Sequence, residues 1–183
     1  PATFSSIAVR YSTGVNGDWD NTATWSATAV GGPGGASVPN ASTIVIIGDA
    51  THNHTVTINK NYTSAYKITI HGKLKVVSPF FGHNLGTVDG NGTLYLEAGT
   101  FPAGVYTSFL NCVNSGTVEY GGTGNYTIVA DLYDQVPNLL FSGTGTRVLP
   151  DKDLTICNSF IIGTLTDGPV VDNSVYNRKL IIE

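Results

Sequence analysis

The sequence predicts an all-β protein, a right-handed parallel β-helix (β-solenoid) with coils of about 20–24 residues. Short apolar strands return along the chain at a nearly constant interval of this length. Intervals of roughly 20 to 50 residues are typical of repeat architectures, and a strand-only unit suits one coil of a stack. The anchors of these strands are Ile46, Ile70, Leu94, Val118, Leu140, Ile161 and Ile181. We expect the seven to stack as one ladder.

Alternation within the strand segments supports this interpretation. Apolar and polar side chains alternate over residues 43–47, 54–58 and 67–71, as in strands with one wet face. Turn residues separate the segments, for example Asp89–Gly92 and Ser142–Gly145. No segment has a sustained period of 3.6 residues, so almost no helix is expected.

The lead-in to these strands is predicted to be a cap. Residues 1–43 are expected to be irregular, and Gly31–Gly35 (GGPGG) must form a turn. Trp19 and Trp25 in this segment are expected to cover the open end of the stack, which would otherwise expose core and strand edges. The alternative is a ligand platform. Residues 44–183 are assigned to the solenoid, continuing beyond the chain.

Composition excludes several classes of function. Only 12% of the 183 residues are charged, against roughly 25% in ordinary domains, and 41% are hydrophobic. The net charge is −4 and the nine Lys and Arg residues are scattered, so no nucleic-acid partner is expected. No apolar run approaches the ~18 residues of a membrane span. Low charge with abundant Thr, Asn and Gly is typical of extracellular β proteins.

One family resemblance covers most of the chain. NGDWDNTATW, followed by Pro39 and the strands TIVII, HTVTI and KITIHGKLKV, resembles the Trp-containing lead-in of large secreted or cell-surface bacterial β-helix proteins. GTVEYGGTGNYTI, NLLFSGTGTRVL and LTICNSFIIGTL resemble the repeats that follow it. The resemblance implies an adhesin-like cargo of type IX secretion, located outside the cell. The resemblance is specific for the fold and the extracellular setting, but it says little about any activity.

Enzymatic signatures are missing. Inverting polysaccharide hydrolysis needs two carboxylates roughly 6.5–9.5 Å apart, and the motifs by which polygalacturonase-like β-helices supply them do not occur. The nearest match to a lyase site is Asp151–Lys152–Asp153, which the adjacent Pro150 places in a solvated turn. No catalytic residue is therefore predicted.

One metal site is a candidate. Asn16, Asp18 and Asp20 have the alternating oxygen ligands of a calcium loop, without the glycine and distal glutamate of a full EF-hand. The commoner role of such residues is a helix cap or an Asx-turn. His52 and His54 are too few for a structural zinc site and are expected to line a turn. No other cofactor is expected.

The two cysteines are predicted to be free. Cys112 and Cys157 are 45 residues apart, which is about two coils. Strands two coils apart on one face lie ~9.6 Å apart, beyond the roughly 7 Å limit for a disulfide. Both thiols are thus expected to be buried as small hydrophobes.

Loops with aromatic side chains are the candidate ligand-binding surface. The residues are Phe80, Phe81, Tyr106 and Tyr133. Loops projecting from one face of a solenoid often form its binding face. The alternative is that these rings fold back and cover the edges of the coils.

The favoured function is a non-catalytic extracellular scaffold, adhesin-like, with loops that bind a glycan or a protein partner. The alternatives are a polysaccharide-active lyase or hydrolase, its ancillary carbohydrate-binding domain, and a stalk without a ligand. The last strand, Lys179–Ile182, carries no capping residue. Its edge is a template for pairing, so we expect further repeats or a partner chain to cover it.

Overall fold

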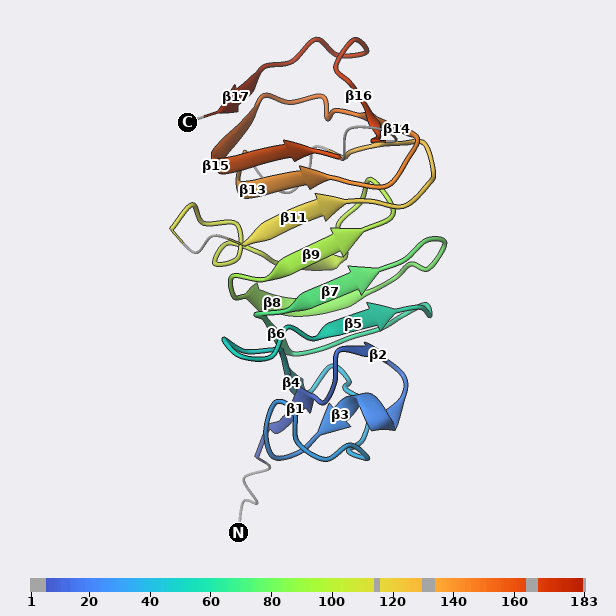
Figure 1. The fold of residues 1–183 in the computed structure, drawn as a ribbon, viewed down its shortest axis with the longest axis vertical. Coiled ribbons are helices and arrows are strands. Elements are labelled where there is room, and N and C mark those ends of the chain that lie inside the picture. Colours follow the sequence, from blue (N-terminus) through green and yellow to red (C-terminus); the bar gives the residue numbers. More distant parts are fainter. Residues whose placement is uncertain (1–5, 114–115, 130–133, 164–167, 183) are drawn as a thin grey trace.

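The chain forms a right-handed parallel β-solenoid of about six turns. The structure is a computed structural model that describes residues 6–113, 116–129, 134–163 and 168–182. In Figure 1 most strands of the front sheet run from left to right as the chain climbs from its N-terminal end, which gives the right hand. The predicted fold class is therefore confirmed.

One sheet, called sheet B, runs the full length of the stack. Residues Val56, Leu74, Leu94, Val118 and Leu139 stand opposite one another in adjacent strands. Each step from one of them to the next is the length of one coil. In spatial order the strands are β2 (Asn16–Asp18), β5 (Thr55–Ile58), β7 (Lys73–Val76), β9 (Thr93–Leu96), β11 (Thr117–Tyr120), β13 (Gln135–Phe141), β15 (Leu154–Ile162) and β17 (Leu180–Ile182).

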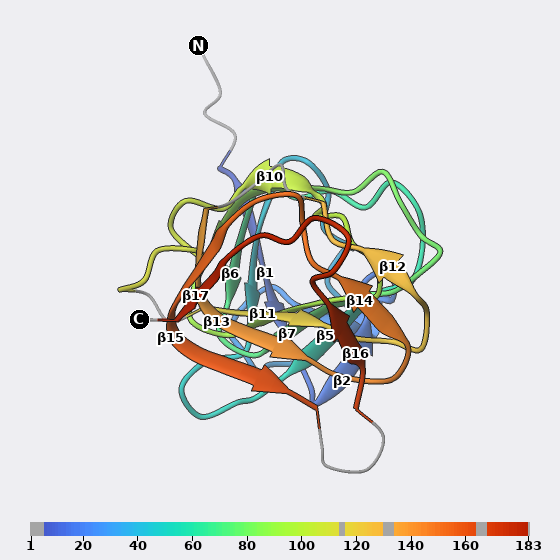
Figure 2. The same ribbon diagram turned by 90° about the horizontal axis from the view of Figure 1, so that it is seen from above.

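The wall facing sheet B changes part-way along the stack. Sheet A serves the N-terminal coils and contains β3 (Trp25–Ser26), β1 (Ala8–Ser12), β4 (Thr43–Ile47), β6 (Lys67–Ile70), β8 (Asn84–Asp89) and β10 (Ala103–Val105). Sheet C serves the C-terminal coils and contains β12 (Tyr126–Thr127), β14 (Thr146–Val148) and β16 (Val170–Asp172). Seen from above in Figure 2, sheets A and C lie on different sides of the coil.

The core lies between these walls because the strands alternate. In β4, β5, β6, β7 and β9 every second side chain is buried, and the residues between them are only partly covered. Val45 and Ile47 of sheet A point inward, as do Leu94 and Val118 of sheet B. The inward side chains form one continuous hydrophobic cluster along the stack. This pattern confirms the predicted alternation.

The predicted ladder of seven anchors is wrong in its register. Ile70 belongs to sheet A, where it stands opposite Ile47 rather than Ile46. The next anchor, Leu94, belongs to sheet B. The reason is that each coil has two strands of similar apolar character, so a constant step along the sequence can lead from one sheet to the other. Towards the C-terminal end Ile161 points outward and is 51% exposed.

The predicted tryptophan cap is present at the N-terminal end. Trp19 follows β2, the outermost strand of sheet B, and Trp25 begins β3, the outermost strand of sheet A. Both rings are buried and pack edge to face with centroids 5.2 Å apart. The Trp25 Nε1–H donates to the carbonyl of Trp19 at 2.7 Å. A short 3₁₀ helix, η1 (Thr22–Thr24), connects the two tryptophans.

The cap is less irregular than predicted. β1 and β2 lie within residues 1–43, and they pair in parallel with β4 and β5 respectively. The first coil therefore begins at Ala8 inside the segment expected to be irregular. Among the described strands only β3 departs from the solenoid pattern, since it pairs antiparallel with β1. This reversal turns the chain back across the end of the sheet.

A buried arginine holds the C-terminal coils together. The Arg147 guanidinium donates hydrogen bonds of 2.6–3.1 Å to the carbonyls of Gly121, Gly122, Gly124 and Ser142. It also lies 4.5 Å from the centroid of the Tyr126 ring. These carbonyls belong to two successive coils, so one side chain satisfies the turns of both.

Candidate functional site

A pocket of about 240 Å³ lies where two successive coils leave sheet B. One wall is the segment that follows β7, and the other is the segment that follows β9. The first strand ends at Val76, and Pro79, which cannot donate to a sheet ladder, lies in the segment that follows it. The residues used below are Phe80, Phe81, His83, Glu97, Thr100 and Phe101.

Phe81, one of the lining residues, forms an exposed aromatic pair with Tyr62 of the preceding coil. Phe81 is 57% exposed, and its ring meets that of Tyr62 edge to face with centroids 5.5 Å apart. The Phe81 N–H donates to Asn61 Oδ1, and the Tyr62 N–H donates to the Phe81 carbonyl, both at 2.9 Å. Gly82 follows at a φ of +74°, and a Cβ there would lie 2.6 Å from the Tyr62 ring. The sequence therefore holds Phe81 in place through backbone contacts to the preceding coil.

His83 lies deep in the pocket wall. Its side chain is buried, and neither ring nitrogen makes a hydrogen bond to another described group. Burial lowers the pKa of His83; the Phe80 carbonyl opposes this shift but is not in hydrogen-bonding geometry. The imidazole is consequently neutral at physiological pH, with one N–H donor and one nitrogen acceptor.

The carboxylate of Glu97 is already engaged. Lys75 Nζ lies 3.3 Å from Glu97 Oε1, and the Tyr95 hydroxyl donates to the same oxygen at 3.1 Å. The Ser78 N–H donates to the other oxygen at 3.3 Å. Burial, together with the negative charge of Glu97, raises the pKa of Tyr95, which stays a hydroxyl. The pocket thus contains a compensated charge rather than a free one.

The four aromatic candidates have different outcomes. Phe80 and Phe81 line the pocket. Tyr106 does not fit the expected exposed ring: it is buried, its hydroxyl donates to the Pro102 carbonyl at 2.8 Å, and it packs edge to face on Phe101. Tyr106 folds back over the coil because its ring closes the core where sheet A ends. Tyr133 lies outside the described residues.

The calcium candidate remains a prediction. Asn16 and Asp18 are the ends of β2, and Asp20 lies in the turn after it, where the nearest charged partner is Lys60 Nζ at 3.9 Å. Among the described residues no group of three His, Cys, Asp or Glu side chains could hold a metal ion. The backbone carbonyl of Asp18 accepts from the N–H of Asn21, which closes the turn.

The histidine pair lines a turn, as predicted. His52 Nδ1 lies 2.9 Å from Asp49 Oδ1, and both side chains are exposed. Hydrogen bonds from the Thr51 N–H, the His52 ring and the Thr51 hydroxyl lower the pKa of Asp49. His54 is buried and lies 2.8 Å from the Ser12 hydroxyl, so the two histidines serve separate partners. This arrangement joins the cap to the second coil.

The lyase-like triplet is a structural turn. Arg178 pairs with Asp151 at 2.8 Å, and the Lys179 N–H donates to Asp153 Oδ1 at 2.9 Å. Lys152 pairs with Asp134. These contacts fasten the last described coil to the one before it.

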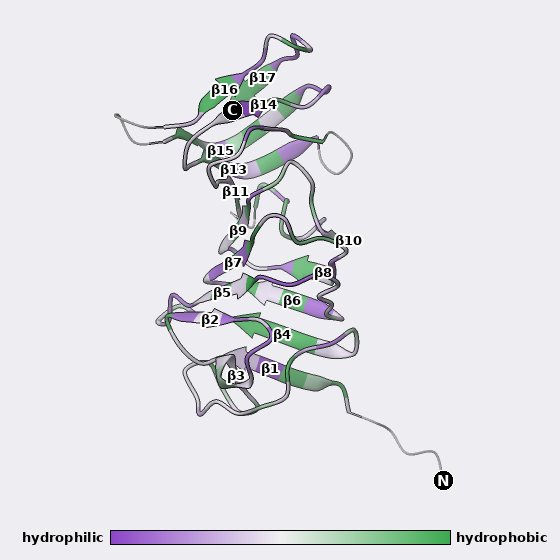
Figure 3. Ribbon diagram, turned by 90° about the vertical axis from the view of Figure 1, so that its right-hand side faces the viewer, coloured by the Kyte–Doolittle hydropathy of each residue, from purple (hydrophilic) through white to green (hydrophobic). Residues whose placement is uncertain are grey.

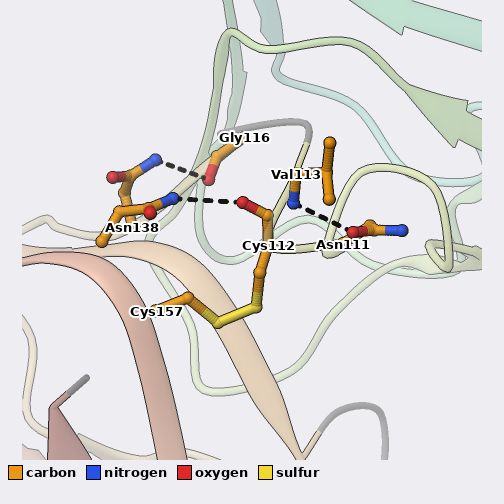
Figure 4. The surroundings of a disulfide bond; sticks show 7 residues. Asn111, Cys112, Val113, Gly116, Asn138 and Cys157 are labelled. Atoms are coloured by element: carbon orange, nitrogen blue, oxygen red, sulfur yellow. Dashed lines mark hydrogen bonds between the residues drawn. A yellow bond between two sulfur atoms is a disulfide. The ribbon is translucent and has the colours of Figure 1, made fainter.

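The two cysteines form a disulfide, so the prediction of free thiols is wrong. Cys112 and Cys157 are joined, with their Cα atoms 5.7 Å apart, and neither cysteine is free. Figure 4 shows the bond beside Asn111 and Val113 of the loop that contains Cys112. The predicted separation assumed two strand positions, whereas Cys112 lies in a loop between β10 and β11.

A β-bulge explains how Cys157 reaches this loop. In the pairing of β13 with β15, Val136 stands opposite Ile156 and Asn138 opposite Ser159. Two residues of β15, Cys157 and Asn158, therefore face the single residue Pro137. Proline has no N–H for the ladder, and a bulge at this point re-aims the side chain.

The residue that sequence reasoning missed is His83. Nothing in its neighbourhood marks a site, since a single histidine after Gly82 also suits a turn. Its importance depends on burial between two coils. The adjacent Phe80–Phe81 pair was the available signal.

Comparisons with protein-family models, curated proteins and solved structures found no match to this chain. The resemblance to type IX secretion cargo accordingly stays a prediction. Among the described residues no helix is both long and apolar enough to cross a membrane.

Proposed function

We propose that this chain is a non-catalytic, extracellular β-solenoid module of a bacterial surface or secreted protein, adhesin-like, which serves as a scaffold and binds a glycan. The observation that carries this proposal is the disulfide between Cys112 and Cys157. Disulfides persist mainly in oxidising compartments and are rare in the cytosol. This bond supports the setting that composition and resemblance predicted.

The continuous sheet supports the scaffold role. Eight strands of sheet B stack over the full length, and their outer face is joined across coils by polar side chains. Lys73 Nζ donates to Glu119 Oε2 at 2.8 Å, and the Ser142 hydroxyl donates to Glu119 Oε1 at 2.7 Å. One carboxylate thus connects residues of three strands or their ends. A stack braced in this way suits a rigid spacer between a cell surface and a ligand.

The pocket supports binding rather than cleavage. Glu97 is the one carboxylate among its lining residues, and it is paired with Lys75. Hydrolysis by inversion needs a second carboxyl group roughly 6.5–9.5 Å away to activate water. The lining of this pocket offers no such second carboxyl group, which favours an ancillary binding role over the enzymatic alternative.

Two measurements test this proposal. The chain is incubated with a panel of neutral and acidic polysaccharides, and reducing ends and unsaturated products are followed. We expect neither to accumulate, and steady release of either would make the chain an enzyme. Thiol titration of the denatured, unreduced protein recovered from its own cells should find no free cysteine; two free thiols there would remove the support for an extracellular setting.

A further inference from the structure

A second, shallower hollow of about 520 Å³ crosses four successive coils on the side where each coil enters sheet A. Its lining consists of Ala41 before β4, residues 64–66 before β6, Asn84, Gly86 and Thr87 of β8, and residues 103–105, which form β10. Stacked strands lie ~4.8 Å apart, so this groove follows the axis of the stack for about 14 Å. Its shape suits an extended ligand. Ala103 lines both the groove and the pocket described above.

The side chains of the groove are open to solvent. Tyr66 is 54% exposed and Val105 is 57% exposed, and Asn84 is exposed as well. Tyr66 and Asn84 each stand next to a buried core residue, Ala65 and Leu85 respectively. Because successive side chains of extended backbone point to opposite faces, Tyr66 and Asn84 point outward. A ligand in the groove can therefore reach both.

The groove is neutral, and its polar groups are hydrogen-bonding ones. The described lining residues carry no charge. Lys67 and Asp89, the next charged residues along β6 and β8, pair with each other at 3.5 Å. Asn84 Oδ1 accepts from the Gly86 N–H at 3.0 Å, so the Asn84 amide group still offers its N–H donors. The Ser64 hydroxyl can both donate and accept. This chemistry matches a neutral ligand that carries many hydroxyl groups.

An exposed aromatic pair precedes two of the segments that line the groove. Tyr62 is 72% exposed at a φ of +58°, a left-handed conformation that bulky residues rarely adopt. Such strain is typical of functional positions, and burial does not offset it here, since its partner Phe81 is exposed as well. Tyr62 comes two residues before Ser64, and Phe81 three before Asn84. Segments of this length span at most about 7 and 11 Å, so a ligand that fills the groove is long enough to reach the pair.

We propose that the groove binds a linear neutral glycan along the stack, with sugar rings against Tyr66 and the Tyr62–Phe81 pair and sugar hydroxyls hydrogen-bonded to Asn84. The face of an aromatic ring carries negative partial charge and attracts the weakly positive C–H groups of a sugar. An extended peptide would instead pair with a strand edge, whereas β6 and β8 are paired on both sides. This inference rests on the glycan-binding part of the proposed function and names its surface.

The test is a titration of the whole 183-residue chain followed by NMR of its backbone amides. The probes are the β-1,4-linked hexasaccharides of glucose, xylose and mannose, with hexagalacturonate as the charged comparison and the hexapeptide Ser-Val-Ser-Val-Ser-Val as the peptide comparison. One or more neutral hexasaccharides should bind with a Kd at or below ~1 mM and move the amides of residues 64–66 and 84–87. The charged probe and the peptide should bind at least about tenfold more weakly. If no neutral hexasaccharide binds, or if the peptide binds more tightly, the proposal fails.

Variants separate recognition from folding. Tyr66→Ala and Tyr62→Ala each remove an exposed ring and should weaken the best hexasaccharide about tenfold. Asn84→Asp keeps the oxygen that accepts from Gly86 but loses the amide donor, so it should weaken binding to a similar degree. Thermal unfolding confirms that each variant is folded. Tyr176→Ala, which removes an exposed aromatic near the far end of the stack, should leave the affinity unchanged. Unchanged affinity in both Tyr66→Ala and Asn84→Asp would overturn the site.

The outcomes also distinguish this site from the proposed function. Glycan binding that survives both Tyr66→Ala and Asn84→Asp would overturn the groove as its site and leave the module proposal intact. Cleavage of a bound glycan would overturn the non-catalytic function even if the same variants show that the glycan lies in the groove.

Discussion

At the N-terminal end of the stack two tryptophans and the reversed strand β3 cover the first coil, whereas at the C-terminal end β16 and β17 are uncovered. Trp19 and Trp25 are buried, while Ile182 is 58% and Val170 61% exposed. In Figure 3 hydrophobic colour is visible on β16 and β17 at the outer end. The same kind of apolar strand is therefore closed at one end and open at the other.

This difference shows what a solenoid needs at its ends. Within sheet B every inner strand pairs with a strand on both sides, but the outermost strands leave backbone donors and acceptors unpaired. In the described structure β17 pairs only with β15, and β16 only with β14. We propose that a strand of another chain pairs with this end.

The largest expected effect is at the closed end. Trp25→Ala removes a fully buried ring and its hydrogen bond to the Trp19 carbonyl, so the free energy of unfolding should fall by roughly 3–5 kcal/mol. Urea denaturation followed by circular dichroism measures it, with Tyr176→Ala as an exposed control. A loss below ~0.5 kcal/mol, the size expected of a surface substitution, would mean that the tryptophans do not close the stack.

The disulfide joins the loop between β10 and β11, in the middle of the molecule, to β15 near the open C-terminal end. Replacing both Cys112 and Cys157 by serine should lower the free energy of unfolding by about 2–4 kcal/mol, because a 45-residue segment gains freedom in the unfolded chain. Differential scanning calorimetry of the wild type should show that reductant lowers its free energy of unfolding by the same amount as the double substitution. No response to reductant would contradict the bond.

Mild acid should lower the stability of the N-terminal half of the stack, which contains His54 and His83, before that of the C-terminal half. The pKa of His54 is lowered by burial and by His52, and that of His83 by burial. The unfolded chain then binds more protons, so the free energy of unfolding falls as pH drops below the usual value of 6.5 and through the folded pKa values. Asp172 in the open half has a pKa lowered by Ser174, and its stabilisation is lost only below 3.8.

Urea denaturation between about pH 7.5 and pH 5 measures this dependence. His83→Gln should flatten it, because this substitution removes a histidine whose pKa burial lowers. Since all four histidines lie between residues 52 and 83, amide exchange should show the acid-induced loss there and not in β15 or β17. A uniform loss along the stack would contradict the separate behaviour of the two halves.

The smallest effect on stability is expected at the open end. Ile182→Lys changes an exposed side chain on an edge strand, so the free energy of unfolding should change by no more than ~0.5 kcal/mol. The same change should reduce self-association, because a charge on an edge opposes strand pairing. Sedimentation of the two proteins at equal concentration tests this. A wild-type chain that stays monomeric would argue against an exposed docking edge.

Much of the candidate site was not predictable. Phe80 and Phe81 stood out because paired aromatics in a turn segment have no strand to pack in. His83 did not stand out in the sequence, because its burial depends on two successive coils that enclose it. Tyr106 is the opposite case. It lies in a loop like Phe80 and Phe81, but its ring is buried in the core where sheet A ends.

The sequence by itself determined the solenoid, the alternation of its strands and the tryptophan cap, because these follow from local periodicity and from the burial of large apolar side chains. Tertiary structure decided which strands share a sheet, where the facing wall passes from sheet A to sheet C, and that Cys112 meets Cys157. It also decided that Arg147 lies in the interior among backbone carbonyls. The physical reason is that register, bulges and loop paths depend on contacts between coils, and a repeat with two similar strands per coil does not distinguish them locally.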